Sequence, residues 1–276
     1  MKEEINKKYL KEKQYKTTKY LEARIKIHQF TKNKIGFHEW IFNQYDLSEF
    51  EKNNDEIKIL DVGCGTGIFW KKNIDSFKKY NLNITFTDAT SAMVEKEKIN
   101  TEELNAKKTF EVADIDNLDK YKGQFDIVFC HNVLYHAENK DNSIKNLKDC
   151  LNDKPSSFCS ITTNSEKHMI NVYEIGRSLD KNFPIDRIID SFTEEIADQM
   201  LPKYFKLDKK IEEEELRVTD WEILMGFVAS GVEPRGIKLV DNFWDEYKKI
   251  YDEEISKNGY FQIIKRSPLY ICKKKN

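Results

Sequence analysis

An apolar run that ends near an aspartate and leads into three alternate glycines occupies residues 57–67, and it constrains the fold more than any other segment. The stretch from Ile57 to Val62 is typical of a short strand buried in a parallel sheet. The glycines that follow let the backbone approach a ligand closely and permit positive φ angles. The helix expected from Ile68 would turn its free N–H groups toward the same ligand. The segment therefore predicts a ligand-binding loop at the carboxyl edge of an α/β sheet.

Two further predicted strands, 83–88 and 108–114, also end in a carboxylate. In nucleotide-binding α/β folds an acid at the end of the second strand accepts hydrogen bonds from ribose hydroxyls, which makes Asp88 the expected ribose residue. Ala89 beside it is expected to pack against an adenine. Terminal acids on three strands in chain order favour a nucleoside ligand over ordinary loop acids. Segments 125–130 and 157–164 predict the fourth and fifth strands.

The spacing of the loop distinguishes between cofactors. Dinucleotide enzymes favour G-x-G-x-x-G, whereas residues 61–67 read D-x-G-x-G-x-G. This pattern resembles motif I of the class I S-adenosylmethionine-dependent methyltransferases, in particular the small-molecule type that includes the quinone-biosynthesis enzymes. The resemblance is specific over roughly residues 55–165. One departure lies at residues 154–157, where serines stand in place of the usual glycine pair before the fifth strand.

The resemblance implies a fold and a cofactor. The expected fold is α/β, a Rossmann-like seven-stranded sheet that is mostly parallel with strand seven antiparallel, with helices on both faces. The expected cofactor is S-adenosylmethionine, with S-adenosylhomocysteine as the product. Asp114 is expected to receive the adenine amino group, Ile115 to cover the ring, and the backbone of His131 to hold the methionine part.

The expected cofactor-binding set spans the loop, the strand ends and the N-terminal segment. In related enzymes an N-terminal helical segment folds over the cofactor. Tyr20 and Arg24 are therefore expected to meet the methionine carboxylate, because the guanidinium group of an arginine can bind a carboxylate with two hydrogen bonds. The alternative for Arg24 is a plain surface residue. The full set is Asp61, Gly63, Cys64, Gly65, Gly67, Asp88, Ala89, Asp114, Ile115, His131, Tyr20 and Arg24.

Methyl transfer from a sulfonium is a one-step in-line displacement, so most of the catalysis is positioning. A general base helps only where the nucleophile must lose a proton. His136 is the first candidate, because the loop after strand four borders the methyl group in this family, and Tyr135 is expected to orient the acceptor or contact the sulfonium. His168 is the second candidate base. The alternative for Tyr135 and His136 is that they cap the loop.

Composition excludes several other classes of protein. With 46 basic and 48 acidic residues the net charge is −2, so no nucleic-acid partner is expected. No apolar run reaches the length of a membrane span and the N-terminus has no signal core, which predicts a cytoplasmic protein without a membrane partner. The five cysteines have no metal-type spacing and the five histidines form no close pair, so no metal is expected.

The chain divides by pattern into a helical lid and a catalytic domain. Residues 1–50 are expected to form the N-terminal helical lid, and residues 51–276 the S-adenosylmethionine-dependent methyltransferase domain. Helical elaborations are expected at about 166–204 and 219–258, with a closing hairpin made of 205–217 and 260–272.

The function favoured is transfer of a methyl group from S-adenosylmethionine to an O, N or C atom of a small-molecule acceptor. Methylation of RNA or protein is one alternative, and a non-catalytic S-adenosylmethionine-binding module is another. The sequence identifies neither the acceptor and its methylated atom, nor the pathway, nor the oligomeric state.

Overall fold

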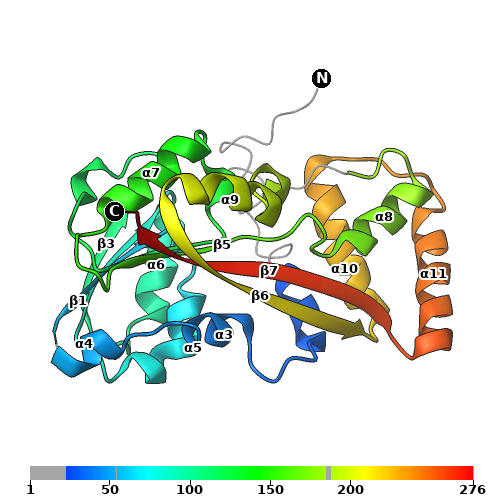
Figure 1. Ribbon diagram of the computed structural model, residues 1–276. Helices are drawn as coiled ribbons and strands as arrows, with labels where there is room; N and C mark the ends of the chain where they lie inside the picture. Colours follow the sequence, from blue (N-terminus) through cyan, green and yellow to red (C-terminus); the bar gives the residue numbers. More distant parts are fainter. Residues whose placement is uncertain (1–22, 54, 185–187, 276) are drawn as a thin grey trace. The chain divides into compact units, whose positions relative to one another are not determined.

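The computed structural model describes residues 23–53, 55–184 and 188–275 (Figure 1). Its sheet has the strand order β3-β2-β1-β4-β5-β7-β6. Strands β1 to β5 pair in parallel, and β7 is antiparallel to β5. This confirms the predicted seven-stranded sheet. The strands are β1 (Ile57–Val62), β2 (Leu82–Asp88), β3 (Lys107–Val112), β4 (Ile127–His131), β5 (Phe158–Thr162), β6 (Phe205–Val218) and β7 (Phe261–Lys274).

Along the chain, two of the described helices precede β1 and the others lie between successive strands. They are α3 (Phe37–Phe42), α4 (Ser48–Asn53), α5 (Ile68–Phe77), α6 (Ser91–Asn100), α7 (Lys140–Cys150), α8 (Ile170–Leu179), α9 (Glu194–Met200), α10 (Trp221–Val232) and α11 (Phe243–Asn258). Short 3-10 turns add η2 (Ile27–Phe30), η3 (Asp119–Tyr121), η4 (Leu134–His136), η5 (Ile188–Ser191), η6 (Leu201–Lys203) and η7 (Glu233–Arg235). The expected helical elements before and after the central strands are therefore present.

Contacts divide the chain into two compact units. The first comprises the described parts of residues 1–34, 166–190 and 213–266, and the second those of 35–165, 191–212 and 267–276. Residues 35–50 belong with the sheet, since Ile41, Leu47 and Phe50 are buried in its core. The predicted domain boundary near residue 50 stays a prediction.

The second unit is built on two apolar layers, one on each face of the sheet. On one face α5 packs against α3 (Figure 1), and Phe69, Trp70 and Phe77 of α5 are buried with Phe86 and Phe129 of the strands. On the other face α7 and α9 contribute to a separate core cluster. Each such fully buried aromatic side chain contributes roughly 2–3 kcal/mol through apolar burial. The two layers fix the ends of β1, β2, β4 and β5, where the predicted site lies.

The first unit has its own core around α8, α10 and α11. Phe183 stacks on Phe243 with ring centroids 5.6 Å apart, and both are buried with Tyr247. A Cβ on Gly176 of α8 would lie 2.6 Å from the Phe183 ring, so only glycine permits this close packing. This unit carries α8, α10 and α11, whereas α9 of the segment after β5 belongs to the second unit.

Candidate functional site

The glycine loop after β1 has the backbone that the sequence predicts. Gly63, Gly65 and Gly67 have φ angles of 70°, 59° and 75°, a region that side chains rarely adopt. The amides of Gly63 and Cys64 both donate to the Thr87 carbonyl of β2, at 2.7 and 2.9 Å. The loop is therefore held against the end of the neighbouring strand, and α5 begins directly after Gly67.

Each glycine faces different surroundings. A Cβ on Gly63 would lie 2.5 Å from Val133, and one on Gly67 would lie 2.2 Å from Glu97 Oε2, whereas one on Gly65 would meet nothing within 4 Å. The loop is thus packed at its two ends and open at its middle glycine. This open cradle is the place where a ligand can approach the backbone.

Glu97 of α6 is a buried acid that sequence reasoning missed. Its side chain is 0% exposed, and neither carboxyl oxygen has a hydrogen-bond partner among the described residues. Burial, aided by the charges of Asp61 and Asp88, raises the pKa of Glu97 to about 9. The carboxyl group therefore stands protonated against Gly67 at neutral pH.

Asp61 lies beneath the loop near the end of β1. It is buried, and the Trp70 indole donates a 2.7 Å hydrogen bond to its Oδ2. Burial raises the pKa of Asp61 to about 7 and the nearby Asp88 adds to the rise, while the Trp70 hydrogen bond opposes it. A cationic group of a ligand would favour the ionised form of this carboxyl group.

Asp88 at the end of β2 faces the middle of the loop. Its Oδ2 accepts the Gly65 amide at 3.2 Å, and its Oδ1 accepts the Thr90 amide at 2.9 Å and the Thr90 hydroxyl at 2.8 Å. A carboxylate has about four lone-pair positions, so it can still accept from a ligand hydroxyl. Ala89 follows it, half-buried. The geometry fits the expected ribose and adenine roles, which stay predictions.

The third predicted acid follows β3. Asp114 Oδ1 accepts the Asp116 amide at 3.1 Å, and Ile115 is buried in the core cluster on the α7 face. The expected contact between Asp114 and the adenine amino group stays a prediction.

His131 at the end of β4 forms a polar cluster that the sequence did not predict. Its Nε2 lies 3.2 Å from the Tyr45 hydroxyl and 2.9 Å from the Ser160 hydroxyl, and the two hydroxyls are 2.7 Å apart. Burial lowers the pKa of His131 to about 3, aided by His38. Tyr45 is not among the site residues that the sequence predicts. The available signal was Ser160, a polar residue in the middle of a fully buried strand.

Two more polar side chains at this edge lack partners. Asn132 has a φ of 59°, and its amide donates to the Thr162 carbonyl at 3.1 Å. Asn132 Oδ1 and Thr162 Oγ1 are both buried without a hydrogen-bond partner among the described residues. Since buried polar atoms are normally paired, this edge presents hydrogen-bonding capacity that the chain itself does not satisfy.

Tyr135 and His136 lie in η4, directly after β4. Their rings meet edge-on with centroids 4.6 Å apart, and the Ser191 hydroxyl donates to the Tyr135 carbonyl at 2.7 Å. Both belong to the same compact unit as the glycine loop.

The remaining predicted residues lie elsewhere. Arg24 and His168 are in the first unit, where Arg24 Nε donates to the Ser230 hydroxyl at 3.1 Å and His168 Nδ1 lies 3.2 Å from the Arg266 carbonyl. Tyr20 lies outside the described residues. Burial raises the pKa of the Cys64 thiol, which leaves that side chain without nucleophilic character.

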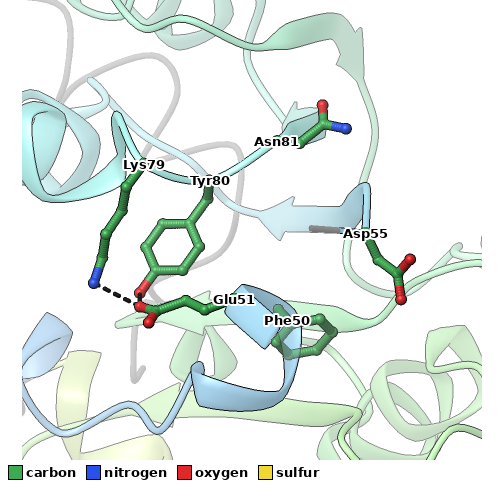
Figure 2. Close-up of a pocket in the computed structure, with 6 residues that line it drawn as sticks. All are labelled: Phe50, Glu51, Asp55, Lys79, Tyr80 and Asn81. Carbon is green, nitrogen blue, oxygen red and sulfur yellow. Dashed lines mark hydrogen bonds and ion pairs between the residues drawn. The ribbon is translucent and has the colours of Figure 1, made fainter. Parts of the chain in front are cut away.

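A pocket of about 230 Å³ lies at the opposite edge of the sheet (Figure 2). It is lined near the starts of β1 and β2 by Asp55 and Asn81, while ligands of open α/β sheets bind at the carboxyl ends of strands. Figure 2 shows Lys79 and Tyr80 both directed at Glu51, 2.5 and 2.7 Å from its Oε1. These charged and polar groups satisfy one another, so this pocket is not the candidate site.

The donor set fits a nucleoside cofactor. The open cradle at Gly65 lies beside the Asp88 carboxylate. Within the described ranges no three His, Cys, Asp or Glu side chains form a metal-binding group. Nor does the described part of the chain contain a helix with the length and apolarity needed to span a membrane.

Comparisons with known proteins agree with this geometry. A family model described as a methyltransferase domain matches residues 60–154. The chain is 27% identical over 238 residues to malonyl-[acyl-carrier protein] O-methyltransferase 2 of Ilyobacter polytropus, covering 80% of this chain and 88% of that protein. It is 32% identical over 119 residues to the ubiquinone biosynthesis O-methyltransferase of Rickettsia conorii, covering 42% of this chain and 39% of that protein.

A solved structure supports the same fold. The plantazolicin methyltransferase BamL, described in complex with a triazolic desmethylPZN analog and SAH, matches with a TM-score of 0.51 at 16% identity, over 97% of this chain and 94% of that one. At this identity the likeness concerns the fold alone. The glycine loop, the strand order and the sequence matches together support a class I S-adenosylmethionine-dependent methyltransferase, with the methyltransferase domain matched over residues 60–154.

Proposed function

We propose that the protein transfers a methyl group from S-adenosylmethionine to a small-molecule acceptor. The observation that carries this proposal is the open Gly65 cradle beside the Asp88 carboxylate, at the carboxyl edge of β1 and β2. Two matched relatives are named as O-methyltransferases, one of malonyl-[acyl-carrier protein] and one of ubiquinone biosynthesis. Their names support an O atom as the target. N and C atoms are the other possible targets.

The cofactor is assigned to the loop and the strand ends. Asp88 would accept hydrogen bonds from the ribose, and Ala89, Asp114 and Ile115 would surround the adenine. Gly63, Gly65 and Gly67 would let the backbone approach the methionine part, with Asp61 beneath them, Cys64 between them and His131 beside them. Tyr20 and Arg24 remain candidates for the methionine carboxylate.

S-adenosylmethionine supplies a methyl group activated by a positively charged sulfur. The residues of this chain then have to place the acceptor in line and exclude water. His136 is proposed to take a proton from an acceptor that arrives protonated, and Tyr135 to orient that acceptor. His168 is the second candidate base.

A labelling experiment tests the function. Purified protein is incubated with methyl-labelled S-adenosylmethionine and a lysate of the organism that encodes it, and the products are separated into metabolite, protein and RNA fractions. We expect label in the metabolite fraction, and much less label with the Asp88→Ala variant at the same subsaturating concentration of S-adenosylmethionine. The Asp75→Ala variant is the matched control, because Asp75 is an exposed partner of Lys78.

The alternatives have distinct outcomes. Label in RNA or protein would replace the small-molecule acceptor with a macromolecule. A protein that binds S-adenosylmethionine but labels no fraction would favour a non-catalytic binding module. The cytoplasmic location stays a prediction that fractionation of the cells can test.

A further inference from the structure

Tyr45, His131 and Ser160 form a closed triangle of hydrogen bonds at the ends of β4 and β5. The three separations between Tyr45 Oη, Ser160 Oγ and His131 Nε2 lie between 2.7 and 3.2 Å. Aromatic rings enclose the triangle. His131 stacks on Phe129 at 5.1 Å and meets the edge of Phe69 at 5.0 Å, and Tyr45 stacks on Phe129 at 5.6 Å.

Counting the hydrogens decides which nitrogen of His131 is protonated. If Nε2 is bare, the Tyr45 hydroxyl donates to Ser160 Oγ and the Ser160 hydroxyl donates to Nε2, so both hydroxyl hydrogens are used. If Nε2 carries a hydrogen, one hydroxyl hydrogen has no acceptor in the triangle. An unsatisfied polar group in such surroundings costs about 1–3 kcal/mol. The triangle therefore favours the tautomer with the hydrogen on Nδ1.

Nδ1 has no partner within the described residues. The hydrogen bonds of His131 all involve Nε2. Nδ1 does not occur among the fully buried side-chain atoms without a hydrogen-bond partner, so this atom is not fully buried. Because burial lowers the pKa of His131 to about 3, the ring is neutral at physiological pH. His131 thus presents one N–H donor away from the triangle.

This donor lies next to the cofactor loop. Phe129 is paired with Asp61 across β4 and β1, so the same register places His131 beside Gly63. The loop after β4 touches the cofactor loop, because Val133, two residues after His131, occupies the space that a Cβ on Gly63 would need. The donor is therefore at the carboxyl edge where the acceptor and the methionine part of the cofactor would meet.

We propose that Nδ1–H of His131 donates a hydrogen bond to an anionic oxygen in the site, which makes the methyl acceptor an oxygen nucleophile such as a carboxylate rather than an amine. This inference rests on the proposed methyl transfer. An N–H donor attracts an oxygen that holds negative charge, whereas an amine or ammonium group would turn N–H bonds or positive charge toward it. Tyr45 and Ser160 act as positioning residues that keep the donor on Nδ1.

An anionic oxygen can come from the acceptor or from the methionine carboxylate of the cofactor. Nitrogen-15 NMR of histidine-labelled protein separates these sources, with the His131 signal assigned through the His131→Asn variant. The ligand-free protein is expected to show a bare Nε2 and a protonated Nδ1. The protein is then titrated with S-adenosylhomocysteine, with 5′-methylthioadenosine, which lacks the carboxylate, and with malonate or 1,3-diaminopropane in the presence of methylthioadenosine.

Each outcome supports or overturns the inference. A protected Nδ1–H that appears with malonate and not with the diamine assigns the donor to the acceptor. Its appearance with S-adenosylhomocysteine but not with methylthioadenosine assigns it to the cofactor carboxylate and overturns the inference about the acceptor. A protonated Nε2 in the free protein, a response to the diamine, or no response to either carboxylate would overturn it. Failure of S-adenosylhomocysteine to bind the natural protein in isothermal calorimetry would instead contradict the proposed function, while the tautomer still decides the donor.

Variants distinguish a donor from a merely structural residue. Asparagine keeps an N–H donor near the Nδ1 position, so His131→Asn should bind malonate within about threefold of the natural protein, whereas His131→Leu should bind about tenfold more weakly, as the loss of one charge-assisted hydrogen bond predicts. The double variant Tyr45→Phe, Ser160→Ala keeps His131 but removes both hydroxyls. It should show a mixture of the two tautomers, and an unchanged pure Nδ1–H form would contradict the positioning role.

Discussion

The two halves of the carboxyl edge of the sheet carry different kinds of side chain. At β1 and β2, the acids Asp61, Asp88 and Glu97 surround a glycine turn. At β4 and β5, neutral groups, His131, Tyr45 and Ser160, are linked inside a wall of aromatic rings. Carboxyl groups suit the hydroxyl and amino groups of a nucleoside, while fixed groups without charge suit the orientation of a reacting atom. The first half is expected to govern cofactor affinity and the second half turnover.

Removal of the candidate base gives the largest expected effect. For an acceptor that arrives protonated, His136→Ala should lower turnover by about 10² to 10⁴ while S-adenosylmethionine affinity stays nearly unchanged, as kinetics and calorimetry on the same preparation can show. The anionic acceptor inferred from His131 needs no base and should be methylated at a nearly unchanged rate. A small effect on turnover would mean that the acceptor arrives already ionised. Equal losses of turnover and affinity would contradict the division between the two halves.

Removal of the expected ribose residue should have the opposite signature. Asp88→Ala should weaken S-adenosylmethionine binding by about a hundredfold, since hydrogen bonds to a charged group contribute about 1.5–3 kcal/mol. Isothermal calorimetry measures this loss, with Asp75→Ala as the exposed control. Unchanged affinity would show that the ribose is bound elsewhere.

Two glycines of similar conformation sharpen the comparison within the loop. Gly67→Ala and Gly65→Ala both place a side chain at positive φ, but only the Cβ at position 67 meets Glu97. We expect Gly67→Ala to lower the free energy of unfolding by about 2 kcal/mol more than Gly65→Ala does, because overpacking adds to the backbone strain. Denaturant titration measures both values.

The second half of this test uses Glu97. Adding Glu97→Ala to Gly67→Ala should return the loss to that of Gly65→Ala. If the double variant is no better than the single one, the strain at Gly67 has another source.

The smallest expected effect is a pH dependence of stability. The pKa of Glu97 is raised on folding from about 4.5 to about 9, so the folded state binds a proton that the unfolded state loses above pH 4.5. Stability is therefore greatest below about pH 4.5 with respect to this group and declines toward pH 9. Glu97→Gln, which stays neutral, should exceed the natural protein by about 2 kcal/mol at pH 6 and match it near pH 3.5, because each pH unit in this window corresponds to about 1.4 kcal/mol. A difference that does not change with pH would contradict the assignment.

Local signals made the β1–β2 half predictable from the sequence. A glycine turn and a strand-terminal acid are adjacent in the chain, so the spacing at residues 61–67 and the position of Asp88 carry the information directly. The seven-stranded sheet with strand seven antiparallel, and the neighbouring positions of β6 and β7, followed from the resemblance, and the structure confirms them.

The β4–β5 half was not predictable in the same way. Tyr45 and Ser160 are 115 residues apart, and only the packing of the segment between α3 and α4 onto β4 and β5 brings them to His131. Glu97 was missed for a similar reason, because its lack of partners depends on how α6 packs against Gly67. Long-range contacts of single side chains leave no periodic trace in a sequence.

The hydrogen bond from Trp70 to Asp61 gives this protein a built-in optical reporter. The indole is 1% exposed and donates directly to a carboxyl group whose pKa lies near 7. A charge that appears or disappears 2.7 Å from the indole nitrogen alters the electric field at the ring, and with it the fluorescence of Trp70. Binding of a ligand at the cofactor loop can therefore be followed through the intrinsic fluorescence of Trp70, without an added label.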